Sequence, residues 1–79
     1  MNIKPCVIGL GYVGLPALIK ISKKFNSYGY DISKDRIDGL KKGIDINKDF
    51  SKKTLSIIKS VQLTSKISDI KNCNFFIVC

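Results

Sequence analysis

The sequence contains no histidine, no glutamate and only one arginine, Arg36. Its three cysteines form no C-x-x-C pair, so the sequence indicates neither a zinc site nor a disulfide framework. Free thiols of this kind are typical of a reducing, cytoplasmic compartment. We therefore expect no metal site. Because Cys6 and Cys79 lie in apolar runs, we expect both to act as small buried hydrophobic residues.

Acidic residues are also scarce: 6 aspartates face 14 lysine and arginine residues, which gives a net charge of +8. Such a balance can indicate a protein that binds nucleic acid or a membrane surface. The lysines are dispersed along the chain, however, and the fork-shaped arginine side chains that read base edges are nearly absent. We expect a solvated, lysine-rich surface and no nucleic-acid partner.

Long uncharged apolar segments are missing as well. The most apolar stretch, residues 6–21, contains three glycines, a proline and Lys20, and it is too short to span a bilayer. No small-residue cleavage pattern follows it, so a signal peptide is not indicated. We expect no membrane partner. The 79 residues suffice for one small domain of marginal stability.

The feature around which the chain is organised is a glycine-rich segment that follows a short apolar run. Gly9, Gly11 and Gly14 fit the G-x-G-x-x-G pattern that holds the pyrophosphate of a dinucleotide. The first glycine permits a sharp turn, the second leaves room for phosphates, and the third lets a helix pack closely. N–H groups of the first helical turn would then face the phosphates. The predicted cofactor contacts here are Gly9, Leu10, Gly11, Tyr12, Val13 and Gly14.

Features around the glycines favour a dinucleotide site over an ordinary turn. An apolar strand precedes them, a helical apolar pattern follows, and Asp31 ends the next predicted strand about 20 residues on. A carboxylate there can accept hydrogen bonds from ribose hydroxyls and would repel a 2′-phosphate, which favours NAD over NADP. Arg36 can point back toward the adenosine. The alternatives are that Asp31 is a cap or turn residue and that Arg36 is a solvated surface residue.

The pattern along the chain predicts an α/β fold. Ser33, Ser51 and Ser65 are predicted helix N-caps. The predicted strands cover residues 3–8, 27–31, 61–64 and 75–79. The predicted helices cover residues 12–24 and 33–43, a stretch after Ser51, and residues 65–71, with Leu55, Ile58, Ile67 and Ile70 facing inward. This order predicts a Rossmann-type, doubly wound parallel sheet with strand order 3-2-1-4, and a ligand between the first and fourth strands.

Three segments together resemble the N-terminal part of the UDP-glucose/GDP-mannose dehydrogenase family. They are Val-Ile-Gly-Leu-Gly-Tyr-Val-Gly-Leu-Pro at residues 7–16, Gly-Tyr-Asp-Ile at residues 29–32 and Phe-Phe-Ile-Val at residues 75–78. The chain is most similar to the bacterial UDP-N-acetyl-hexosamine 6-dehydrogenases that supply uronic acids for surface polysaccharides. It departs from the family pattern at Ala17-Leu18, where the usual order is reversed, and at Cys79, where threonine is common.

The resemblance implies a two-step, NAD-dependent oxidation of the C6 alcohol of a UDP-sugar, carried out by a full-length homo-oligomer. It implies that the Val13 backbone contacts the pyrophosphate, that Asp31 holds the ribose and that Arg36 flanks the adenosine. The catalytic residues of the family lie beyond Cys79. We therefore expect residues 1–79 to be a partial NAD-binding domain, without catalytic or sugar-nucleotide domains and inactive alone.

Two other hypotheses remain at this point. One is a nucleotide-sensing regulatory module, which would share the glycine turn and the acidic residue. The other is a non-functional remnant that does not fold, because its fourth strand would be an uncovered sheet edge.

Overall fold

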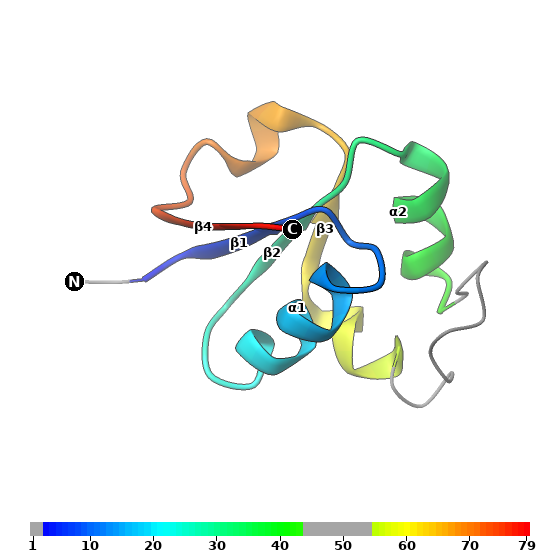
Figure 1. The fold of residues 1–79 in the computed structure, drawn as a ribbon, viewed down its shortest axis with the longest axis horizontal. Helices are drawn as coiled ribbons and strands as arrows, with labels where there is room; N and C mark the ends of the chain where they lie inside the picture. Colours follow the sequence, from blue (N-terminus) through cyan, green and yellow to red (C-terminus); the bar gives the residue numbers. More distant parts are fainter. Residues whose placement is uncertain (1–2, 44–54) are drawn as a thin grey trace.

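A computed structural model describes residues 3–43 and 55–79. Four short strands form one parallel sheet in the order β3-β2-β1-β4 (Figure 1). The strands are β1 (Pro5–Ile8), β2 (Tyr28–Tyr30), β3 (Gln62–Thr64) and β4 (Phe75–Val78). The predicted doubly wound parallel sheet and its strand order are therefore confirmed.

Helical segments connect these strands. They are α1 (Gly14–Ser22), α2 (Lys34–Lys41) and two short 3-10 helices, η1 (Ile57–Ser60) and η2 (Ile67–Ile70). Figure 1 shows α1 and η1 on one side of the sheet and η2 on the other. This is the arrangement that right-handed crossovers produce in a doubly wound sheet.

Local chemistry explains where α2 begins and ends. The Ser33 hydroxyl accepts a hydrogen bond from the N–H of Arg36 at 3.2 Å, so Ser33 is the N-cap that the sequence predicts. Gly43, with φ of +75°, follows the helix in the left-handed conformation typical of helix ends. The predicted cap at Ser65 is wrong, because the N-cap of η2 is Lys66 and no side chain caps it. The predicted cap at Ser51 lies outside the described residues.

Two buried clusters lie on opposite faces of the sheet. Val7 and Cys6, adjacent on β1, belong to different clusters, because successive strand residues point to opposite faces. The larger cluster lies beneath α1 and α2 and includes the predicted inward residues Leu55 and Ile58. The smaller one consists of Cys6, Ile70 and Cys73. β1 is thus buried on both faces, as its continuous apolar run predicts.

β4 differs from β1 in its surroundings. Within the described residues it pairs with β1 alone and forms the sheet edge. Phe75, Phe76 and Val78 are therefore largely exposed, at 53%, 47% and 76%. The expectation that Cys79 is buried is wrong: it follows this edge strand and is exposed.

Candidate dinucleotide-binding site

The glycine-rich turn lies between the carboxyl end of β1 and the start of α1. Gly9 has φ of +93°, a conformation that L side chains rarely adopt. A Cβ there would lie 2.6 Å from the carbonyl oxygen of Cys79. A Cβ on Gly14 would overlap the carbonyl oxygen of Gly9. Both positions therefore require glycine: the first for the turn, the second for the close approach of α1 to it.

Gly11 differs from the other two glycines of the pattern. A Cβ built on it would meet no atom within 4 Å, so the space beside this residue is open. Its carbonyl oxygen accepts the N–H of Leu15 at 3.1 Å, which continues the hydrogen bonding of α1 into the turn. Nothing in the fold of the described residues requires glycine here. The open space is what the pattern predicts for a close ligand.

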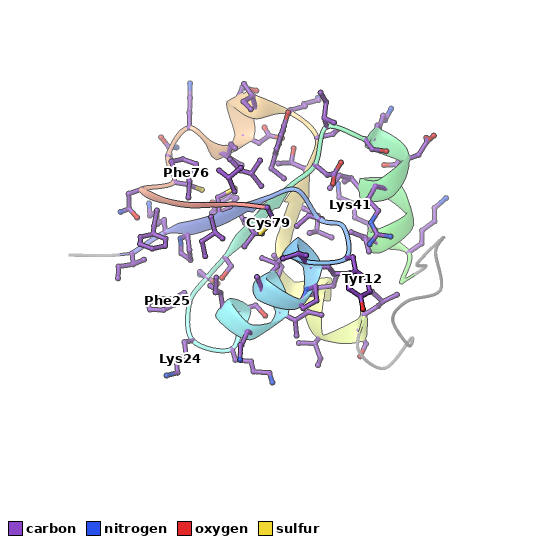
Figure 2. All side chains as sticks on the ribbon, in the orientation of Figure 1. Tyr12, Lys24, Phe25, Lys41, Phe76 and Cys79 are labelled. Carbon is purple, nitrogen blue, oxygen red and sulfur yellow. The ribbon has the colours of Figure 1, made fainter. Side chains whose placement is uncertain are left out.

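The N-terminus of α1 offers polar groups to this space. Its N-cap, Val13, makes no side-chain capping hydrogen bond, and the first turn contains no acidic residue. The side chains of Tyr12 and Val13 are 76% and 67% exposed, and Figure 2 shows Tyr12 at this end of the helix. An uncapped helix N-terminus carries N–H donors and the positive end of the helix dipole. This end is therefore suited to an anion.

Asp31 follows β2 and joins the glycine turn to the start of α2. Its Oδ2 accepts the N–H of Leu10 at 2.8 Å, and its Oδ1 accepts the N–H of Ser33 at 2.9 Å. Asp31 therefore has the structural role of a turn residue, which was the alternative to a role in cofactor binding. Each carboxylate oxygen has a further lone pair, so these bonds do not prevent a ribose hydroxyl from donating to Asp31.

Arg36 also reaches the glycine turn. Its Nε donates to the carbonyl oxygen of Leu10 at 2.9 Å, across a sequence separation of 26 residues. The side chain is half-buried, so the alternative of a freely solvated surface arginine is wrong. Leu10 thus has its N–H bonded to Asp31, its carbonyl bonded to Arg36 and its side chain fully buried. The sequence holds no signal for this pair of contacts, because spacing alone does not show which carbonyl an arginine reaches.

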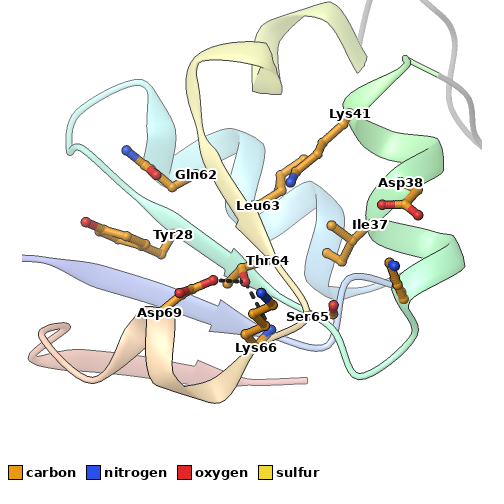
Figure 3. A pocket seen from close by; sticks show the side chains of 11 residues that line it. Tyr28, Ile37, Asp38, Lys41, Gln62, Leu63, Thr64, Ser65, Lys66 and Asp69 are labelled. Carbon is orange, nitrogen blue, oxygen red and sulfur yellow. Dashed lines mark hydrogen bonds between the residues drawn. The ribbon is translucent and has the colours of Figure 1, made fainter.

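A separate cleft is found in the described residues. It has a volume of about 510 Å³ and lies between α2, β3 and η2 (Figure 3). It shares no lining residue with the glycine turn, and neither Asp31 nor Arg36 lines it. Inside it, the Thr64 hydroxyl donates to Asp69 at 2.5 Å, so this polar pair is already satisfied. The cleft borders the candidate site, because the carbonyl of Thr64, which lines the cleft, accepts the N–H of Asp31 at 3.2 Å.

The part of the chain that the structure describes holds no group of three or more metal-ligating side chains. In the same residues, no helix has the length and apolar character needed to cross a membrane.

Comparison with known proteins shows what the chain is similar to. No family model matches the sequence. The chain is 41% identical over 77 residues to UDP-N-acetyl-D-glucosamine 6-dehydrogenase from Salmonella typhi, and 38% identical over 77 residues to the protein of that name from Pseudomonas aeruginosa. Each alignment covers 98% of this chain and 18% of the relative. Over almost its whole length, the chain matches the N-terminal part of UDP-N-acetylhexosamine 6-dehydrogenases.

Solved structures agree with this match. UDP-D-ManNAc dehydrogenase from Pyrococcus horikoshii superposes with a TM-score of 0.76 at 30% identity, covering 98% of this chain and 20% of that one. A GDP-mannose dehydrogenase from Pseudomonas aeruginosa gives a TM-score of 0.78 at 19% identity, over 95% of this chain and 19% of that one, which shows the fold alone. The resemblance stated from the sequence and the predicted Rossmann-type fold are confirmed. The chain spans about a fifth of the length of these relatives.

Proposed function

We propose that residues 1–79 form the NAD-binding, N-terminal part of a nucleotide-sugar 6-dehydrogenase. One observation carries this proposal: the open space at Gly11, the uncapped start of α1 and the carboxylate of Asp31 lie together at one end of the sheet. The relatives matched over 98% of the chain are dehydrogenases of UDP-sugars by name. The whole protein would oxidise the C6 alcohol of a UDP-sugar to the uronate in two steps, for surface polysaccharide synthesis.

The residues present fit the adenosine and pyrophosphate half of NAD. The pyrophosphate would lie over Gly11 and receive N–H groups of the turn that leads into α1, where the helix dipole contributes about 0.3–1 kcal/mol. No acidic residue of that turn opposes its charge. Asp31 would accept the ribose hydroxyls through its remaining lone pairs and repel a 2′-phosphate. Arg36 would flank the adenosine.

These positions indicate which part of the reaction NAD would carry and which part the residues of this chain would carry. Bound NAD supplies the hydride acceptor. The residues of this chain bind and orient the half of the cofactor that does not react, and we assign no catalytic residue to them. We expect the 79-residue chain alone to bind NAD and to oxidise no UDP-sugar.

Substitution of Asp31 tests this proposal. Asp31→Ala should weaken NAD binding and reduce the preference for NAD over NADP, as measured by calorimetric titration of each nucleotide. It also leaves the N–H groups of Leu10 and Ser33 without their acceptor, so urea unfolding of the same variant should show a loss of about 1–3 kcal/mol.

Asp38→Ala is the matched control, because it removes an exposed carboxylate of α2 that makes no hydrogen bond to the glycine turn in the structure. It should leave both affinities as in the parent chain. If Asp31→Ala leaves both affinities unchanged, Asp31 is not part of the site. NADH formation from a UDP-sugar by the purified chain would contradict the expected lack of activity.

A further inference from the structure

The peptide units on both sides of Leu10 are held by side chains from the next β-α unit. The N–H of Leu10 donates to Asp31 at 2.8 Å, and its carbonyl accepts Nε of Arg36 at 2.9 Å. We propose that Arg36 is a positioning residue that aims the N–H of Gly11 toward the phosphates by holding the carbonyl of Leu10. This inference rests on the proposed function, because it concerns the same phosphate-binding turn.

Peptide geometry links the orientation of the Leu10 carbonyl to that of the Gly11 N–H. The carbonyl of Leu10 and the N–H of Gly11 belong to one peptide unit, and no cis peptide bond occurs in the described residues. In a planar trans peptide the C=O and N–H bonds point in opposite directions. Fixing the carbonyl toward Arg36 therefore directs the Gly11 N–H away from it. Within the described residues no main-chain acceptor takes this N–H, and the space beside the Gly11 Cα is open, so the donor is available to a ligand.

The turn needs such a constraint because glycines flank Leu10 on both sides. Glycine has more backbone freedom than any other residue, and fixing one residue costs roughly 1–2 kcal/mol of conformational entropy. The buried Leu10 side chain anchors the Cα but does not set the orientation of the following peptide. The Arg36 contact does so before a ligand arrives, which lowers the ordering cost of binding.

Four hydrogen bonds close this arrangement into a ring. Ser33 donates its N–H to Asp31, Asp31 accepts from Leu10, Leu10 accepts from Arg36, and the N–H of Arg36 returns to the Ser33 hydroxyl. The N-cap of α2 thus fixes the backbone from which the arginine reaches the turn. A lysine keeps the positive charge but has no donor at the Nε position and no rigid planar group. Arg36→Lys therefore separates positioning from charge.

The first measurement uses no ligand. NMR relaxation and amide exchange of the ¹⁵N-labelled chain should show residues 9–11 more mobile in Arg36→Lys than in the parent, at a temperature where urea unfolding shows both chains to be fully folded. Lys41→Gln is the control, since it removes a charge from the last turn of the same helix, at a residue that lines the separate cleft. It should leave residues 9–11 as in the parent. Equal mobility of this turn in Arg36→Lys and the parent would overturn the proposal.

The second measurement separates positioning from direct contact with adenosine. Inorganic pyrophosphate lacks adenosine, so a residue that only flanks the adenosine would not affect its binding. We expect Arg36→Lys to weaken the binding of pyrophosphate as well as that of NAD, roughly threefold to tenfold for pyrophosphate through the loss of one hydrogen bond. Weakened NAD with unchanged pyrophosphate would assign Arg36 to adenosine alone and contradict positioning. If the parent chain binds neither, the proposed function fails, while the ligand-free comparison still decides the role of Arg36.

Discussion

Asp31 and Leu10 show how single residues serve the fold and the proposed cofactor together. Asp31 has the spacing of a ribose-binding carboxylate, yet both of its oxygens also accept main-chain N–H groups of this chain. Leu10 lies within the glycine pattern, yet its N–H and carbonyl are bonded inside the protein and its side chain is buried. Residues of this kind cannot be divided into structural and functional ones. Substitutions there must be judged by stability and binding together.

Cys6 makes stability depend on alkaline pH. Burial, and then the neighbouring Cys73, raise the pKa of Cys6 from 9.0 to about 12. Between these values the unfolded chain loses the thiol proton while the native chain keeps it, so the thiol destabilises the fold as pH rises from 9.0 toward 12. Its contribution is fully present below pH 9.0. We expect urea unfolding to show Cys6→Ala losing less stability over this range than the parent.

Cys79→Ala is the control for this prediction. Its thiol is exposed at the end of β4, so its removal should leave the pH dependence as in the parent. The slope owed to one proton is at most about 1.4 kcal/mol per pH unit. An identical slope in Cys6→Ala and the parent would show that this thiol does not contribute.

At the scale of elements, the sequence could predict more of the sheet than of its short helices. Right-handed crossovers leave one order for four parallel strands, and the predicted ranges differ from the observed ones mainly at the ends. The contact between Arg36 and Leu10 could not be predicted. It depends on the β1–β2 register, which pairs Ile8 with Tyr30, and on where α2 begins. Both are set by packing across the sheet rather than by local pattern.

The inward-facing residues of η2 could also be predicted only in part. Its predicted inward residues were Ile67 and Ile70, but Ile67 is 64% exposed while Ile70 is 4% exposed. η2 is one turn of 3-10 helix rising about 2 Å per residue, so Ile67, at its start, is separated from Ile70, at its end, by about 6 Å along the axis. Only Ile70 belongs to the small cluster with Cys6 and Cys73.

The two isoleucines of η2 form a matched pair for a stability test. Ile70→Ala should cost about 2–5 kcal/mol, because it removes buried methyl and methylene groups and leaves a cavity. Ile67→Ala removes the same atoms from an exposed position and should change stability by at most about 0.5 kcal/mol. Urea unfolding of both variants measures the difference. Equal losses would show that the second cluster is not a packed core.

At the scale of the whole molecule, two features have opposite effects on association with a second copy: the exposed apolar edge of the sheet favours it, and the high net charge opposes it. Within the described residues β4 pairs on one side only, and its four residues carry no charge, proline or bulge of the kind that protects natural sheet edges. Such an edge favours pairing with the same strand of a second copy. The net charge of +8 repels a second copy. Salt shortens the range of this repulsion, because the Debye length falls from about 10 Å at 0.1 M salt to about 3 Å at 1 M.

These opposing effects predict association that increases with salt. Sedimentation velocity of the 79-residue chain should show a larger associated fraction at high salt, and Phe76→Lys should suppress it by placing a charge on β4. Ile57→Lys is the matched control, because Ile57 is 43% exposed against 47% for Phe76 and lies on η1, away from the edge. Equal suppression by both variants would mean that net charge alone governs association. A parent chain that stays monomeric at high salt would show that this edge does not pair.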